Sequence, residues 1–194
     1  MIQVPVLKSL LQIIMPSMVA WVDQMEQIVL AHGRPLSSSE ISDAVELGVV
    51  HPERVRYMIA DEIPIPAKEL AELVRQAGIA DEDVMGIAFR YGIFIHSDVV
   101  GKELRLLHDL VHVAQFERLG DIQNFIKEYV TACLDYGFGR SPFEVEAREK
   151  SEKVMARQAS KTMDKMSYHL IIERALARKE RNGGHIFSLT MPQR

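Results

Sequence analysis

Helical periodicity dominates the sequence, but residues 84–98, VMGIAFRYGIFIHSD, depart from it. β-Branched and aromatic side chains cluster there around Gly92, a composition that favours a strand or a hairpin. A second such segment, residues 52–66, alternates Val55, Tyr57 and Ile59 and closes on two prolines, which predicts another strand. We therefore expect an α+β fold, mostly helical, with a small β-sheet that precedes a helix at about 100–118.

Capping residues mark the ends of several predicted helices. Ser37 and Glu40 have the spacing of a capping box, and Gly48 is placed to end the same helix. Ser141 and Pro142 suit the N-cap and first turn of a long helix. Helices are accordingly predicted at about 21–31, 37–48, 67–78, 100–118, 121–137 and 142–181, and residues 182–194 are expected to form an irregular tail.

The composition fits one globular domain over residues 1–194. The chain has 194 residues, of which 47% are hydrophobic, which is enough for one sizeable core. Its formal net charge of -4 offers no general attraction to a polyanion, so nucleic acid is not an expected partner. Cys133, the one cysteine, lies among apolar residues and is expected to be a buried small hydrophobe.

The first 35 residues are expected to form an N-terminal helical extension. Their apolar run is interrupted by Gln12, Pro16 and Ser17, and a charge returns at Asp23, so the run reads as too short and too broken for a transmembrane helix. An amphipathic helix docked on the domain is the favoured interpretation, with peripheral contact to a membrane surface as the alternative. A cytoplasmic location is therefore expected.

The helix predicted at 100–118 carries His108 and His112 within the sequence HDLVH. At this spacing the two side chains lie one turn apart, about 6 Å along the axis, and project from the same face. Both imidazoles can then reach one ion, which is why this spacing recurs in helix-borne zinc sites. The chain has 7 histidines, so a chance pair in a plain helical core without metal remains an alternative.

A zinc site that is open for catalysis needs a third protein ligand. The sequence SPFEVEAREKSE offers Glu144 or Glu146 in the first turn of the long final helix. Without a metal, both glutamates would simply complement the helix dipole. Together with the histidine pair they favour metal ligation, and the residues alone leave the choice between the two glutamates open.

These motifs resemble the active-site helix and the third-ligand helix of gluzincin-type zinc metallopeptidases. LLHDLVHVAQFERLG followed by PFEVEA is similar to a set of uncharacterised bacterial proteins with the pattern HELVHVxQ and a glutamate-containing helix. The resemblance covers about residues 87–148, the expected metal-site core, and implies a zincin-like fold with zinc as the cofactor. The family motif ExxxD aligns with Glu144 and Arg148, which implies Glu144 as the third ligand and Glu146 as the second choice. Arg148 replaces an aspartate that orients a ligand histidine in such enzymes.

The resemblance also implies roles for Asp109 and for a strand. Asp109 stands where these enzymes carry the general-base glutamate, and the loss of one methylene withdraws its carboxylate by about 1 to 1.5 Å. Asp109 is accordingly the expected catalytic residue, with weakened proton transfer. Zincins also place an antiparallel edge strand along the cleft, where it pairs with an extended peptide. The resemblance puts Tyr91, Gly92, Ile93 and Phe94 on that strand as substrate-binding residues.

Two functions are compatible with these features. The first is a zinc-dependent metallopeptidase or peptidase-like hydrolase, in which HDxxH is a variant of HExxH and the activity on a peptide or protein substrate is weak. The second is a catalytically inactive zincin-like metal-binding protein that acts as an interaction module. Both are built on the same expected ligands, His108, His112 and Glu144.

Overall fold

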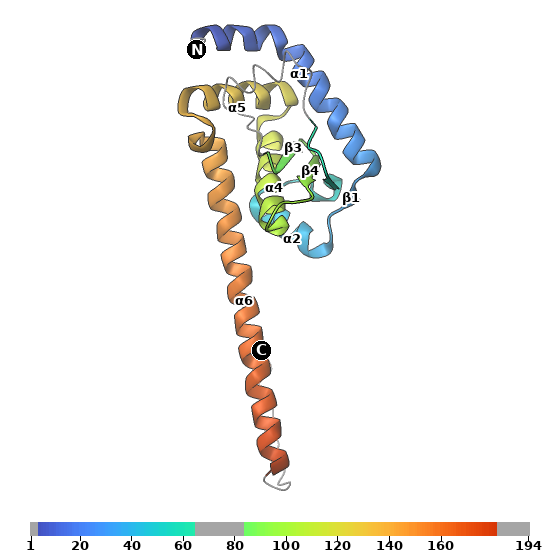
Figure 1. The fold of residues 1–194 in the computed structure, drawn as a ribbon, viewed down its shortest axis with the longest axis vertical. Coiled ribbons are helices and arrows are strands. Elements are labelled where there is room, and N and C mark those ends of the chain that lie inside the picture. The colour runs from blue at the N-terminus through green and yellow to red at the C-terminus, as the bar shows by residue number, and fades with distance from the viewer. Residues whose placement is uncertain (1–3, 65–83, 182–194) are drawn as a thin grey trace. The chain divides into compact units, whose positions relative to one another are not determined.

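The computed structural model describes residues 4–64 and 84–181, which form two compact units (Figure 1). The first unit is Met1–Val154 and the second is Met155–Arg194. Helix α6, Pro142–Arg181, begins in the first unit and supplies the described part of the second. The helix expected at 67–78 and the tail expected at 182–194 lie outside the described residues. The prediction of one domain over 1–194 stays a prediction.

A small mixed sheet lies at the centre of the first unit. Its strands are β1 (Arg34–Pro35), β2 (Arg56–Ala60), β3 (Gly86–Phe89) and β4 (Gly92–His96), in the order β1-β2-β4-β3. β2 and β4 are parallel, whereas β1 and β3 run antiparallel to their neighbours. The structure confirms the predicted α+β class, the strand within 52–66 and the hairpin within 84–98. β1 was not expected, because two residues, one of them proline, give no strand pattern.

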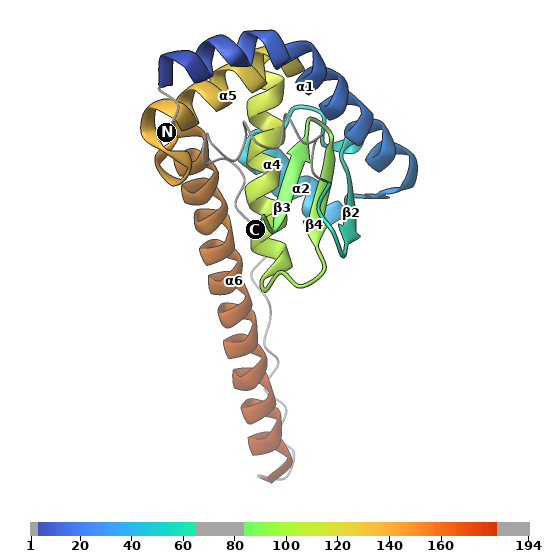
Figure 2. The ribbon, with the colours of Figure 1, turned by 45° about the horizontal axis from the view of Figure 1, so that its top comes forward.

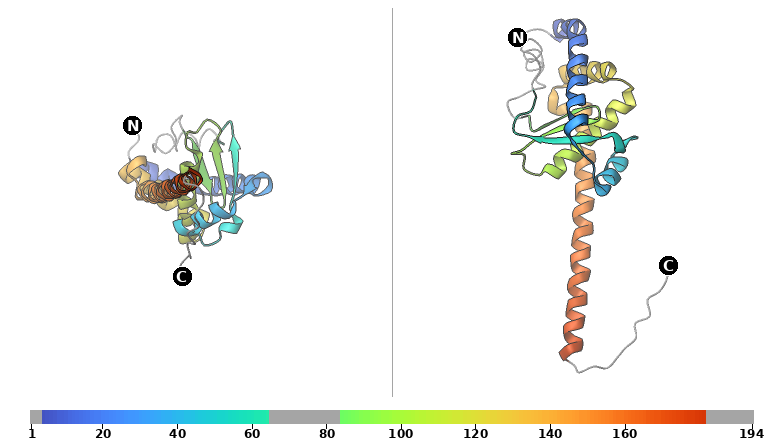
Figure 3. Two further views of the ribbon diagram at one scale, coloured as in Figure 1. Left: turned by 90° about the horizontal axis from the view of Figure 1, so that it is seen from below. Right: turned by 90° about the vertical axis from the view of Figure 1, so that its right-hand side faces the viewer.

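Helix α1, Val4–His32, covers one face of this sheet and crosses its strands (Figure 3). Trp21 on α1 meets Phe89 of β3 edge to face, with ring centroids 5.1 Å apart. Gly92 faces the same helix, because a Cβ there would lie 3.0 Å from the Cβ of Val29. The apolar stripe that α1 buries has helical spacing and consists of Leu7, Leu11, Met15, Met18, Val22 and Val29.

A buried glutamate fastens the β3–β4 turn to α1. Glu26 is 0% exposed, and it accepts hydrogen bonds from Arg90 Nε at 2.9 Å and from the backbone N–H of Tyr91 at 3.1 Å. Arg90 has a φ of 55°, a left-handed conformation that is uncommon outside glycine. The ion pair between Arg90 and Glu26 therefore fixes the position of the hairpin at a turn that would otherwise be unfavourable.

Helix α4, Lys102–Leu119, packs on the opposite face of the sheet against β3 and β4 (Figure 2). Gly86 of β3 faces α4, and its register partner Ile95 on β4, also buried, therefore points the same way. The middle of α4, residues 109–116, is buried on all sides, because helix α2 (Ser38–Leu47) and helix α5 (Ile122–Tyr136) pack on it as well. Polar side chains of α4 in this region therefore need partners inside the protein.

Several local predictions are confirmed. The Ser37 side chain accepts from the backbone N–H of Glu40, and the Glu40 carboxylate accepts from the backbone N–H of Ser37, which is the expected capping box of α2. Gly48 ends that helix with a φ of 101°. Cys133 on α5 is buried as expected, and burial raises the pKa of its thiol to about 11. Short 3-10 helices at Pro52–Arg54 and Phe138–Arg140 precede β2 and α6.

The N-terminal apolar run forms a longer and more continuous helix than expected, and the expectation that it does not cross a membrane stays a prediction. α1 is a continuous helix of 29 residues with Pro16 inside it, and by length and composition it is sufficient to span a bilayer. Core helices of soluble proteins and N-terminal signal sequences meet the same criterion. In this structure one side of α1 packs on the sheet and on α5.

Replacing Gly86 by alanine is expected to destabilise the protein by about 1 to 3 kcal/mol, the usual cost of overpacking. The new Cβ would lie 2.5 Å from Arg105 Nε, 2.7 Å from Asp109 Oδ2 and 3.1 Å from the backbone oxygen of Phe94. Unfolding in denaturant measures the effect. Gly139→Ala is the matched control, because nothing lies within 4 Å of a Cβ there, and its change should stay within about 0.5 kcal/mol. Equal stabilities would contradict the close packing of α4 on β3.

Candidate metal centre

The two histidines of HDLVH lie side by side on α4. Their Nε2 atoms are 3.1 Å apart, and the ring centroids are 4.9 Å apart. The side chain of His108 is 16% exposed and that of His112 is 8% exposed. The expected projection from one helical face is therefore present, and it directs both Nε2 atoms to one point beside α4.

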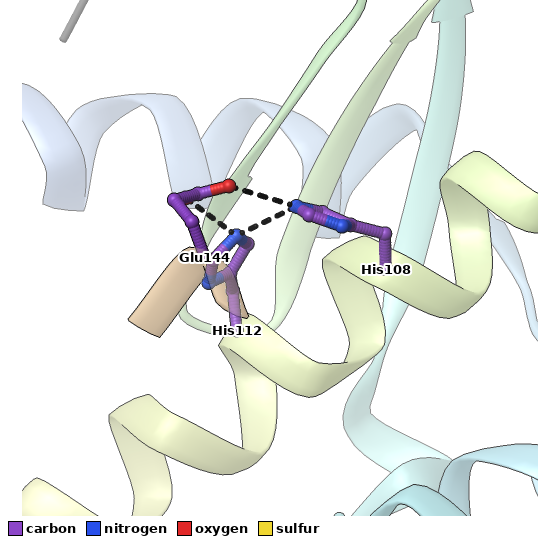
Figure 4. Close-up of side chains that lie close together, drawn as sticks. All are labelled: His108, His112 and Glu144. Atoms are coloured by element: carbon purple, nitrogen blue, oxygen red, sulfur yellow. Dashed lines mark hydrogen bonds and ion pairs between the residues drawn. The ribbon is translucent and has the colours of Figure 1, made fainter. Parts of the chain in front are cut away.

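Glu144 completes the cluster from the first turn of α6 (Figure 4). Its Oε2 lies 3.2 Å from His108 Nε2, and its Oε1 lies 3.2 Å from His112 Nε2. One ligand atom from each of the three residues lies within 4.8 Å of the others, and His112 and Glu144 are buried. Two imidazole nitrogens and a carboxylate oxygen are a donor set that zinc takes in three-ligand sites.

Hydrogen bonds orient His112 for such a role. Its Nδ1 lies 2.8 Å from Oε1 of the buried Gln115. The Gln115 amide nitrogen donates to the backbone oxygen of Phe143 and to Glu146, both at 3.0 Å, so its oxygen is the atom that faces His112. Nδ1 of His112 must then carry a proton, so in the neutral ring Nε2 is the nitrogen with the lone pair that can bind a cation. Outer partners of this kind fix the tautomer of metal-binding histidines.

Glu144 is held as an anion in a buried place. Burial alone would raise the pKa of its carboxyl, but hydrogen bonds with His108 and His112 hold that pKa well below its usual range. Tyr129 on α5 also donates its hydroxyl to Glu144 Oε1 at 2.6 Å. For His112, burial alone would lower the pKa, but the hydrogen bond and the charge of Glu144 raise it. The buried carboxylate is therefore paired with imidazole N–H groups, and a bound cation would take the place of those protons.

Glu146, the second choice for the third ligand, faces away from the histidines. Arg118 donates to its two carboxylate oxygens at 3.0 and 2.9 Å, and Lys150 lies 2.9 Å from it. The hydrogen bond from Arg118 is the largest cause that lowers the pKa of the Glu146 carboxyl to about 2. The structure brings Glu144, and not Glu146, to His108 and His112. Ligation itself stays a prediction.

Arg148, which stands in place of a family aspartate, takes no part in the cluster. Its Nη1 donates to the backbone oxygen of Gly139 at 3.3 Å, at an exposed position. The orienting contact that the family aspartate would make to a ligand histidine is supplied here to His112 by Gln115 instead.

The environment of Asp109 argues against its expected role as a general base. Asp109 is 0% exposed, and Arg105, one helical turn earlier, binds both of its carboxylate oxygens. Arg105 Nη2 also donates to the backbone oxygen of Gly86 at 2.8 Å. Asp109 thus belongs to an ion pair that joins α4 to β3. A carboxylate that is already engaged in this way has no free oxygen for a proton from water in the structure described.

The strand that was expected to bind substrate is not an edge strand, and its role in substrate binding stays a prediction. Tyr91, Gly92, Ile93 and Phe94 are buried, and β4 is paired with β2 on one side and with β3 on the other. Its backbone groups are therefore not free to pair with an extended peptide. Within the described residues, the edge strand next to α4 is β3, Gly86–Phe89. Any pairing of a peptide with this sheet near α4 falls to β3.

Three residues of the centre were missed by sequence reasoning. Gln115 follows His112 by three positions, and Arg105 precedes Asp109 by four, so helical spacing carried a signal for both. Tyr129 lies on a different helix, and nothing in the sequence connects it to the histidines.

Comparisons with known proteins add no relative to this description. The chain matches no protein-family model, no curated protein and no solved structure.

Proposed function

We propose that the chain binds zinc through His108 Nε2, His112 Nε2 and the Glu144 carboxylate. The observation that carries the proposal is the convergence of these three ligand atoms within 4.8 Å of one another in a largely buried place. The hydrogen bond between Gln115 and His112 Nδ1 adds support, because it leaves Nε2 as the nitrogen that can bind the ion. Three protein ligands leave one tetrahedral position for water or a substrate, as in catalytic rather than structural zinc sites.

The function proposed for this centre is that of a metallopeptidase-like hydrolase with weak activity. Zinc in an open site supplies a Lewis acid that polarises a carbonyl and promotes the ionisation of water. The chain's own contribution is to hold the ligands in place, through Gln115 and Tyr129. We also propose that the substrates are peptides or proteins and that the location is cytoplasmic.

A second candidate is a zincin-like metal-binding protein without catalysis, acting as an interaction module. The ion pair between Asp109 and Arg105 favours it, because the residue expected to accept a proton is already engaged. In metallopeptidases that carry a general-base glutamate, proton transfer by that residue contributes about 10²- to 10⁴-fold to the rate. Without this proton transfer, zinc binding would stay intact and most of the catalytic turnover would be lost.

Metal analysis of the purified chain tests the zinc centre directly. Protein prepared without chelator is expected to contain close to one equivalent of zinc, and removal of the metal should lower the melting temperature. Saturation at about a hundred times the dissociation constant would stabilise the fold by about 2.7 kcal/mol. Less than about a tenth of an equivalent, with no thermal shift on adding zinc, would exclude a tight site.

Peptide hydrolysis separates the two candidate functions. The zinc-loaded native protein, Asp109→Glu and Glu144→Gln are compared on a broad peptide library, with the last variant as the blank. Cleavage by either of the first two above the blank supports the hydrolase. If both retain zinc and neither cleaves any peptide, the non-catalytic candidate stands.

Tyr129→Phe is expected to lower the zinc affinity by about tenfold, in the range seen when an outer partner of a ligand is lost. The variant removes the hydroxyl that donates to Glu144 and keeps the ring that packs against Phe125 and Phe143. Competition with a chromophoric chelator measures the affinity. Tyr136→Phe is a matched control, because Tyr136 is 57% exposed on the same helix. An unchanged affinity in Tyr129→Phe would show that the hydroxyl does not support the ligand.

A further inference from the structure

Arg105 shares the face of α4 that carries the candidate ligands. It precedes His108 by three residues and His112 by seven, which is the spacing of a single helical face. Its side chain keeps 24% of its surface exposed, whereas its partner Asp109 keeps none. The guanidinium therefore lies beside the centre and remains accessible from solvent.

The hydrogen bonds of Arg105 leave one of its nitrogens available. Nε and Nη2 donate to Asp109, and Nη2 also donates to the backbone oxygen of Gly86. Within residues 4–64 and 84–181, Nη1 has no hydrogen-bond partner in the structure. Since a guanidinium carries five N–H donors, both N–H groups of Nη1 remain for a ligand.

The charges around Arg105 also affect what it can bind. Burial alone would lower the pKa of its guanidinium, but the charge of Asp109 and, to a smaller extent, the charge of Glu144 raise it. The nearby carboxylates of Asp109 and Glu144 also restrict what an incoming anion can be. A singly charged carboxylate meets less repulsion from them than a doubly charged phosphate does.

We propose that Arg105 forms a carboxylate-binding subsite beside the metal centre, through the two free N–H groups of Nη1. The subsite rests on the proposed zinc centre, because it positions a ligand that also reaches the open metal position. The ligand class is then a molecule with a carboxylate a short spacer away from its metal-binding group. A small dicarboxylic acid and the free C-terminus of a short peptide share this chemistry.

Calorimetry with matched ligands tests the subsite. Succinate and monomethyl succinate have the same length and differ by one carboxylate. Zinc-loaded native protein is expected to bind succinate about tenfold more tightly, equivalent to about 1.4 kcal/mol, because the second carboxylate gains a charge-assisted hydrogen bond. N-acetyl-dialanine and its C-terminal amide form a second pair. A preference for the free acid in that pair alone assigns the subsite to a peptide terminus.

Variants of the Arg105–Asp109 ion pair test whether Arg105 is the group that binds the second carboxylate of succinate. Arg105→Gln alone leaves a buried carboxylate without a partner, so the double variant Arg105→Gln/Asp109→Asn is used to keep the fold. The ratio of the affinities for succinate and for monomethyl succinate should fall to about one in the double variant, because that variant has lost the charge-assisted donor. Asp109→Asn alone retains Arg105 and removes its partner, and the ratio should equal or exceed the native value.

The outcomes separate the subsite from the metal centre on which it rests. Zinc uptake by the double variant is measured first, and it should match that of the native protein. Absence of zinc uptake in the native protein overturns both proposals. Normal zinc uptake with no preference for the free acid in either ligand pair, or with a preference that survives in the double variant, overturns the subsite alone.

Discussion

Replacing Glu144 by glutamine is expected to lower the affinity for the proposed zinc ion by more than about a hundredfold, because outer partners of a ligand alone are worth about 10- to 100-fold. The substitution keeps the shape of the side chain and removes the charged oxygens that lie 3.2 Å from His108 Nε2 and His112 Nε2. An amide oxygen is a poorer zinc ligand than a carboxylate. Chelator competition on the purified variant, with circular dichroism as the check of the fold, measures this loss.

Glu146→Gln is the matched control for that experiment. Glu146 lies two residues further along the same helix and is engaged with Arg118 and Lys150. Among the described residues it is connected to the centre through Gln115, so we expect a change in affinity below about tenfold. A larger loss in Glu146→Gln than in Glu144→Gln would reverse the assignment of the third ligand.

Arg105→Gln is expected to destabilise the fold by about 3 to 5 kcal/mol, the usual result when one partner of a buried ion pair is removed. Asp109 is 0% exposed and would lose the hydrogen bonds that both of its carboxylate oxygens accept from Arg105. The contact from Arg105 Nη2 to the backbone oxygen of Gly86 would be lost as well. Denaturant unfolding of the metal-free protein measures the change without a contribution from zinc.

The second substitution Asp109→Asn shows whether the loss arises from the ion pair. Added to Arg105→Gln, it replaces the stranded carboxylate by a neutral amide, and most of the lost stability should return. If the double variant is as unstable as the single one, packing of the Arg105 side chain matters more than its charge.

Local patterns predicted most of the elements that position the centre. β-Branched and aromatic clustering identified β2 and the hairpin, and the capping residues Ser37 and Glu40 located α2 within a residue. Placement of Glu144 near the histidines depended on a resemblance rather than on periodicity, because spacing along the chain does not show which helix ends meet. The strand order was out of reach for the same reason. β4 became an inner strand through its long-range parallel pairing with β2.

Asp109 shows what single-motif reasoning overlooks. Alignment with HExxH assigned the residue a chemical role from its position in the motif. Its actual partner, Arg105, lies at the i,i+4 spacing that favours an ion pair on any helix. The sequence therefore also indicated an ion pair between Arg105 and Asp109. The burial of this pair against Gly86 favours the ion pair over the role of general base.

The separation of the candidate ligands along the chain has a topological consequence. His108 and His112 precede α5, and Glu144 follows it. A shared cation would therefore close a loop of the chain that contains the whole of α5. Closing a long loop reduces the entropy of the unfolded chain in the way a disulfide does. Removing the cation with a chelator should then loosen the segment between α5 and α6 first. The amides of that segment are expected to exchange hydrogen faster, while the amides of β4 stay protected.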